Sequence, residues 1–231
     1  MKYKEEILQM LFKAYFDARK HKRSKQSQLE FEVNLEQNIF DLYEEIISKT
    51  YTPGTSICFI INQPIKREIF AATFRDRVVH HFIYNIVSPL AEKVFLHDVY
   101  SCRKEKGTLF GIDRAYSKMQ SCSENFTKKT FVLKLDIAGY FMNMNKDKLY
   151  SKVEQLINKN ELFLPIQSNL LKYLISQNIY HDPTIDCKFQ SQKSEWKNLP
   201  KNKSLFGTAT NCGLPIGNLT SQLYGNLYLN E

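Results

Sequence analysis

Apolar side chains recur three and four residues apart in seven stretches of the chain, and this spacing predicts amphipathic helices. The predicted helices cover residues 4–20, 28–48, 74–87, 109–122, 146–158, 166–178 and 220–230. Pro53 and Gly54 are expected to stop the second helix, and Pro89 the third, since proline lacks the N–H that a helix needs. The basic run at 21–25 predicts either a linker or a phosphate-contacting arm.

Two short runs rich in Ile and Phe, at 56–61 and 65–71, flank an Asn-Gln-Pro turn and predict a β-hairpin. A third apolar run, at 131–136, predicts a buried strand that ends at Asp136. Residues 181–206 are polar and irregular, with Trp196 and a lysine-rich segment at 197–203. Helices and short strands alternate without a regular order, which predicts the α+β class.

Composition adds a preference for an anionic partner. The 231 residues are 43% hydrophobic, which supports a real core, and carry a net charge of +8. A polyanion, with nucleic acid as the first candidate, suits that charge. The 13 tyrosines and 16 phenylalanines could also stack on bases, although most of these rings are expected in the core.

The cysteines and the N-terminus favour an intracellular location. The five cysteines are widely separated and form no CxxC pair, so they are interpreted as reduced thiols. The N-terminal MKYKEEILQM lacks the apolar stretch of a signal peptide, and no run has the ~20 apolar residues of a membrane span. We therefore expect a soluble, cytoplasmic protein with no membrane partner.

Several motifs follow one another in a distinctive order. They are Arg67, FRDRVVH at 74–80, SCRKEKGT at 101–108, KLDIAGYF at 134–141 and GLPIGNLTSQ at 213–222. In order and spacing they resemble the fingers and palm blocks of reverse transcriptases, in the bacterial group that includes group II intron, retron and diversity-generating retroelement enzymes. The resemblance covers most of the chain from about Gln63 onward.

One block narrows the resemblance. Most relatives have Gln where Ile216 stands and Pro where Gln222 stands. The IGNLTSQ combination, together with KSLF at 203–206, is most similar to the reverse transcriptases of diversity-generating retroelements. Uncharacterised bacterial relatives that share this combination stay an open alternative.

The resemblance implies an architecture and an activity. The fold would be the fingers and partial palm of a right-hand polymerase, helix-rich with a small antiparallel sheet. Residues 1–125 would form the fingers with N-terminal helices, and 126–231 a partial palm with interleaved finger helices. The activity would be RNA-directed DNA polymerisation, a nucleotidyl transfer that copies template RNA into cDNA with errors at template adenines. The implied partners are template RNA, a nucleic-acid primer and a small basic accessory protein.

Such a polymerase uses two Mg²⁺ ions, or Mn²⁺, and deoxynucleoside triphosphates. Asp136 is the expected catalytic metal ligand, with the carbonyl of Ile137 as a second ligand; the alternative is that Asp136 caps the next turn. The family also has an adjacent Asp pair in a Tyr-x-Asp-Asp hairpin, and no Asp-Asp pair occurs in this sequence. We expect that hairpin beyond Glu231, and we expect the 231-residue chain to be inactive alone.

Nucleotide binding is expected at one aromatic ring and at four cations, of which Arg67 and Arg77 match the family blocks best. Phe141 would exclude the 2′-hydroxyl of a ribonucleotide, with core packing as the alternative. The expected triphosphate-binding cations are Lys66, Arg67, Arg75 and Arg77. Each of these cations alone is more typical of a surface charge or of a partner for Asp76 than of a phosphate ligand.

The remaining expected contacts concern template and base selection. The loop residues Arg103, Lys104 and Lys106 would contact the template backbone. Within GLPIGNLTSQ, Ile216 and Gly217 are expected beside the incoming nucleotide, and Pro215 and Gln222 beside the template. Because Ile216 has no polar group, it would loosen base selection. Two alternatives stay open, a non-catalytic RNA- or protein-binding module and a group II intron or retron enzyme, although Ile216 and Gln222 argue against the latter.

Overall fold

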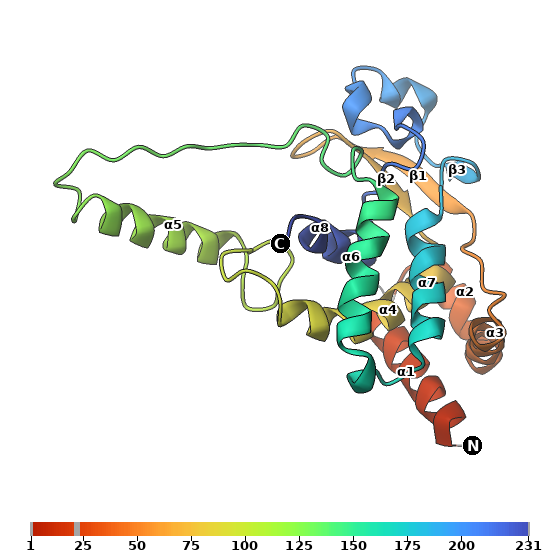
Figure 1. The fold of residues 1–231 in the computed structure, drawn as a ribbon. Helices are drawn as coiled ribbons and strands as arrows, with labels where there is room; N and C mark the ends of the chain where they lie inside the picture. Colours follow the sequence, from red (N-terminus) through yellow and green to blue (C-terminus); the bar gives the residue numbers. More distant parts are fainter. Residues whose placement is uncertain (1, 21–23, 231) are drawn as a thin grey trace.

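The computed structural model describes residues 2–20 and 24–230, so residues 21–23 of the basic run lie outside the described part. The described residues form an α+β fold of eight α-helices with a small three-strand mixed sheet (Figure 1). The elements are α1 Lys2–Arg19, α2 Gln26–Val33, α3 Leu35–Ile47, β1 Ser56–Ile61, β2 Arg67–Ala71, α4 Phe74–Glu92, α5 Thr108–Cys122, α6 Lys146–Lys159, α7 Ser168–Tyr180, β3 Cys187–Phe189 and α8 Leu219–Leu229. Among the helices of this described part, none is long and apolar enough to cross a membrane.

The single helix predicted over 28–48 is two helices, α2 and α3. The break lies at Asn34, whose backbone leaves the helical region at φ −125° and ψ 47°. The Asn38 side-chain amide donates a hydrogen bond of 2.8 Å to the freed carbonyl of Phe31. The Asn34 side chain itself makes no cap hydrogen bond, so the observed side-chain contact at the break is the one from Asn38.

Helix α4 is the centre of the core and contacts α1, α2, α6, α7 and α8. Its apolar side chains are buried on several sides, which explains why helices from both ends of the sequence pack around it. The prediction that Pro89 ends this helix is wrong, because α4 continues to Glu92. Burial of Leu90 and Ala91 in the next turn offsets the hydrogen bond that the proline removes.

The predicted hairpin is confirmed, but the sheet is mixed rather than antiparallel. β1 and β2 pair antiparallel, with Ile57 opposite Ala71 and Ile61 opposite Arg67. β3 comes from the segment predicted to be irregular and pairs parallel to β1, which gives the order β2-β1-β3. Three short 3₁₀ turns follow β3: η2 Lys193–Trp196, η3 Lys201–Lys203 and η4 Leu205–Gly207.

The prediction of a buried strand at 131–136 is wrong. This segment is extended but pairs with no strand in the described part of the chain, and Phe131 and Leu133 are 83% and 81% exposed. With α5 it forms an arm that projects from the body (Figure 1). A strand requires a hydrogen-bonding neighbour as well as a suitable apolar pattern, and the pattern alone could not supply one.

A buried carboxylate connects the start of α4 to the chain before β1. Asp76 accepts hydrogen bonds from the Tyr51 hydroxyl at 2.8 Å, the Gly54 amide at 2.9 Å and the Thr73 hydroxyl at 2.7 Å. Thr73 in turn accepts from the Asp76 amide and caps the helix. Tyr173 of α7 donates to the Tyr51 carbonyl at 2.6 Å, so the network also reaches α7.

Acid is expected to destabilise the fold through His80, one turn after Asp76. Burial lowers the pKa of His80 from 6.5 to about 4, although the Asp76 charge opposes this shift. The unfolded state therefore binds the proton more tightly than the folded state does. The contribution of neutral His80 to the free energy of unfolding is complete above pH 6.5, and it declines by roughly 3 kcal/mol as the pH falls toward 4. The free energy of unfolding in urea should therefore fall less steeply with acid in His80→Gln than in wild type. Parallel profiles, or an equal effect of His97→Gln at an exposed site, would contradict this.

Candidate functional site

Two adjoining grooves meet where the hairpin, the turn after residue 137 and α8 come together. The first, the α8 groove, has a volume of about 490 Å³. The second, the Asp136 groove, has a volume of about 450 Å³. Four residues line both, namely Arg67, Tyr140, Phe141 and Ile216. Residues selected from separate sequence blocks thus share one continuous depression.

Backbone hydrogen bonds hold the loop that starts at Gly213 between the turn at residues 141–144 and strand β2. The Gly213 amide donates to the Met144 carbonyl, and the Leu214 amide to the Phe141 carbonyl, both at 2.9 Å. On the other side, the Phe70 amide of β2 donates to the Ile216 carbonyl at 3.0 Å. The loop therefore fixes the distance between the hairpin and the turn that carries Phe141.

Gly217 is required by this packing. Its φ is +120°, and a Cβ there would lie 2.8 Å from Ile69 Cγ2 and 3.3 Å from the Phe70 carbonyl oxygen. Both the conformation and the contact disfavour any larger side chain. Gly217 is expected beside the incoming nucleotide, and the close contact that its missing side chain permits is one with β2.

The Asp136 groove is electropositive. Lys66, Arg67 and Lys203 line it together with one carboxylate, Asp136. Asp136 is exposed and lies in extended chain, and Ile137 beside it is 52% exposed. Such a balance of charge favours an anionic ligand with several oxygens, because each fixed cation can make a charge-assisted hydrogen bond.

Sequence reasoning noted the lysine-rich segment but did not place Lys203 at the site. The segment reaches the groove because Gly139 has no side chain: at φ +59°, a Cβ there would lie 2.6 Å from the Asn202 carbonyl oxygen. The Lys66 ammonium also donates to the Lys197 carbonyl at 2.7 Å. The sequence shows a glycine before two aromatic residues and a distant basic run, but neither signal indicates the contact between them.

Two aromatic rings stand at the junction of the grooves. Phe141 is half-buried, and its ring packs edge-on against Tyr140 with centroids 5.4 Å apart. The Tyr140 hydroxyl donates to the Gly225 carbonyl at 2.5 Å, and burial raises the pKa of Tyr140 to about 12. The Phe141 ring also packs against α8 at Gly225, where its atoms would lie 3.4 Å from a Cβ, an ordinary van der Waals distance. Helix α8 therefore supports both rings.

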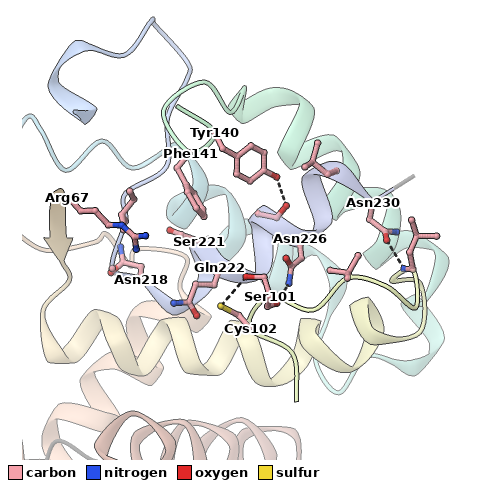
Figure 2. A pocket seen from close by; sticks show the side chains of 16 residues that line it. Arg67, Ser101, Cys102, Tyr140, Phe141, Asn218, Ser221, Gln222, Asn226 and Asn230 are labelled. Atoms are coloured by element: carbon pink, nitrogen blue, oxygen red, sulfur yellow. Dashed lines mark hydrogen bonds between the residues drawn. The ribbon is translucent and has the colours of Figure 1, made fainter. Parts of the chain in front are cut away.

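The α8 groove has a mainly apolar lining with several neutral polar side chains among the apolar ones, and Arg67 is the one charged residue that lines it in the described part of the chain. Figure 2 shows Arg67 and Asn218 at one end, Asn230 at the other, and the Phe141 and Tyr140 rings on the side opposite Gln222. The Asn226 amide donates to the Ser101 carbonyl at 2.7 Å, which connects α8 to the loop after α4. Gln222 is exposed in this groove. Pro215 is buried and instead lines a small cavity beside His80 and His181.

Two predicted triphosphate cations lie away from both grooves. Arg75 forms ion pairs with Glu45 and Asp76 and lies over the Tyr51 ring, 4.9 Å from its centroid. Arg77 is half-buried on α4, and burial lowers its pKa. The structure therefore brings Lys66 and Arg67 together with Phe141 but leaves Arg75 and Arg77 in the body of the fold.

The predicted template loop is organised mainly by its own contacts. The Arg103 side chain is 7% exposed, pairs with Glu92 at 2.7 Å and donates to two backbone carbonyls. The Lys106 ammonium donates to the His97 carbonyl and lies over the Phe110 ring. Lys104 is exposed. Of the three predicted contacts, Lys104 has the side chain most available to a partner.

The donor set does not fit two bound Mg²⁺ ions. Among the described residues, no group of three or more His, Cys, Asp or Glu side chains is close enough to hold a metal ion. Asp136 is the single carboxylate lining the two grooves in this part of the chain. A two-metal centre needs further carboxylates, so no catalytic step follows from these residues through a metal.

No family model matches the chain, and no curated protein matches it.

Proposed function

We propose that this chain is the nucleotide- and template-binding part of a reverse transcriptase of the diversity-generating retroelement type. The observation that carries the proposal is that Lys66, Arg67, Phe141 and Ile216, chosen from three separate sequence blocks, line one groove with Asp136. This convergence supports an RNA-directed DNA polymerase with a deoxynucleoside triphosphate as substrate. Asp136 would contribute one carboxylate to its catalytic centre.

The residues present can bind and orient a nucleotide. Lys66, Arg67 and Lys203 would hold the phosphates, since all three line the same groove. Phe141, at the mouth between the two grooves, would lie against the sugar. The neutral α8 groove would then accept the base and its template partner.

The error-prone character of the proposed enzyme depends on Ile216. Its half-buried apolar side chain lines both grooves, and its backbone is held by the hydrogen bond to β2. No side-chain hydrogen bond from this position can restrain the base. Relaxed base selection, including errors at template adenines, is the proposed consequence.

Nucleotide binding by the whole chain tests the proposal. A fluorescent deoxynucleoside triphosphate should bind, and Arg67→Gln and Lys203→Gln should each weaken binding by roughly ten-fold, the value of one charge-assisted hydrogen bond. Lys159→Gln removes an exposed lysine at the far end of α6 and should leave affinity unchanged. An equal loss in all three variants would indicate nonspecific charge attraction and would contradict the assignment of the groove.

A second candidate, a non-catalytic RNA-binding module with part of a polymerase fold, is favoured by the single carboxylate in the grooves. The same titration separates the two. A module of this kind would bind RNA without binding the nucleotide. A saturable site for the nucleotide that depends on Arg67 favours the polymerase.

A further inference from the structure

A third groove lies outside the proposed nucleotide site. It has a volume of about 270 Å³ and is lined by Phe189, Lys193, Trp196 and Phe206. We call the groove lined by these four residues the aromatic groove. All of them belong to the segment that follows α7, which the proposed function uses only through Lys203.

The rings of the aromatic groove are arranged as a stacking surface. Phe189 and Phe206 lie nearly parallel, with centroids 5.7 Å apart and an interplanar angle of 14°. Trp196 closes one side at a steep angle of 74° to Phe189. Phe189 and Phe206 are 48% and 44% exposed, so much of their apolar surface faces solvent.

Buried contacts hold these rings in place before any ligand arrives. The Trp196 indole N–H donates to the buried Glu68 carboxylate at 2.6 Å. Glu68 also accepts from the Ser204 hydroxyl at 3.0 Å and the Leu205 amide at 2.6 Å. Phe206 packs against Phe70 of β2. The groove is therefore attached to the sheet, and ligand binding would not have to order it.

The charge around the rings favours an anion. Residues 187–206 contain five lysines and one glutamate. Within the described part of the chain, Lys188, Lys193 and Lys203 form no ion pair. The single Glu195 carboxylate accepts from the Gln192 amide at 3.1 Å and does not neutralise them.

We propose that the aromatic groove binds an unpaired base of single-stranded RNA, with Lys193 contacting a neighbouring phosphate. Flat exposed rings surrounded by lysines are what a single strand requires, because every base offers a face for stacking and every linkage carries a charge. The acidic side chains of a peptide would satisfy the lysines but have no aromatic face to stack on the rings. The proposal rests on the proposed function for one point only, the identification of that RNA as the template.

Trp196 provides a direct signal, because it is the only tryptophan in the chain. Its fluorescence should be quenched when a single-stranded oligouridylate or oligoadenylate is titrated into the whole protein. Phe189→Ala should weaken that binding roughly five-fold to a hundred-fold, the range measured for one base stacked on an aromatic ring. Phe189→Tyr should retain it. Phe163→Ala, which removes a ring that is 75% exposed on another part of the surface, should leave it unchanged.

The salt dependence tests the phosphate contact without disturbing the rings. Lys193→Gln should reduce the slope of log affinity against log salt by about 0.7, the value of one phosphate contact on a single strand. Lys159→Gln should not change the slope. Circular dichroism of each variant checks its fold, and the exposed Lys193 variant keeps the test valid if Phe189→Ala does not fold.

Two outcomes would overturn the proposal. One is quenching by polyglutamate at the same concentrations as RNA, and the other is unchanged RNA affinity in both Phe189→Ala and Lys193→Gln. Neither bears on the nucleotide site, because nucleotide binding depends on Arg67. Conversely, RNA binding in the aromatic groove without nucleotide binding would contradict the proposed polymerase function but would still support the proposed RNA site.

Discussion

Asp76→Ala is expected to lower the free energy of unfolding by about 3–5 kcal/mol, the cost of removing one partner from a buried charged network. The carboxylate is 1% exposed and accepts from Tyr51, Gly54 and Thr73, with Arg75 at 3.3 Å. Alanine would leave the buried Tyr51 hydroxyl and the partly buried Gly54 amide without an acceptor. It would also leave Arg75 without one of its counter-charges.

Urea denaturation at pH 7 measures this loss, and the melting temperature should fall by roughly 10 °C in a chain of this size. Asp41→Ala is the matched control, because Asp41 is an exposed carboxylate of α3 whose side chain accepts from Gln37. The control should be indistinguishable from wild type. Equal stability of the two variants would show that Asp76 does not hold the start of α4 to the chain before β1.

The network around Asp76 also shows why the sequence alone could not separate a triphosphate-binding role of Arg75 from a structural one. The spacing of Arg75, Asp76 and Arg77 at a helix start is typical both of an anion site and of a structural cap. Sequence cannot distinguish them, because the deciding partners of Arg75 are Glu45 and Tyr51, which precede it by 30 and 24 residues. Arg103 is a parallel case, since its carboxylate partner Glu92 lies on the preceding helix.

Most of the helices and the hairpin could be predicted, because their signals are local. Periodic apolar positions and the turn residues between β1 and β2 lie within a few residues of the elements that they specify. The failures lie where tertiary packing competes with local preference. Burial of Leu90 and Ala91 carries α4 past Pro89, and the run at 131–136 lacks a neighbour that its β-propensity would need.

Individual residues of the candidate site could be predicted from sequence motifs, but the long-range contacts between them could not. Lys66, Arg67, Phe141 and Ile216 were selected individually from motifs, and the structure brings them together. Lys203 and the buried Glu68 have no such motif. Glu68 contacts Leu205 across 137 residues of sequence, and no spacing rule reports a contact of that length.

The aromatic ring at Phe141 leads to the prediction that bears most directly on the proposed function. The whole chain should bind dATP more tightly than ATP, roughly ten-fold or more, because the 2′-hydroxyl would collide with the ring. Phe141→Ala should abolish most of that preference by improving ATP binding rather than by weakening dATP binding. Competition of each nucleotide against a fluorescent deoxynucleotide gives both affinities.

Tyr140→Phe is the matched control, because it keeps the neighbouring ring and removes only the hydroxyl that donates to Gly225. It should preserve the preference for dATP, as should Phe141→Tyr, which retains a ring at the same place. If Phe141→Ala lowers the affinity for dATP and for ATP equally, the ring only contributes to the packing of the groove and does not discriminate between the two sugars. Because Phe141 lies against Gly225 of α8, such an equal loss would indicate that α8 has shifted, and the steric role would then be rejected.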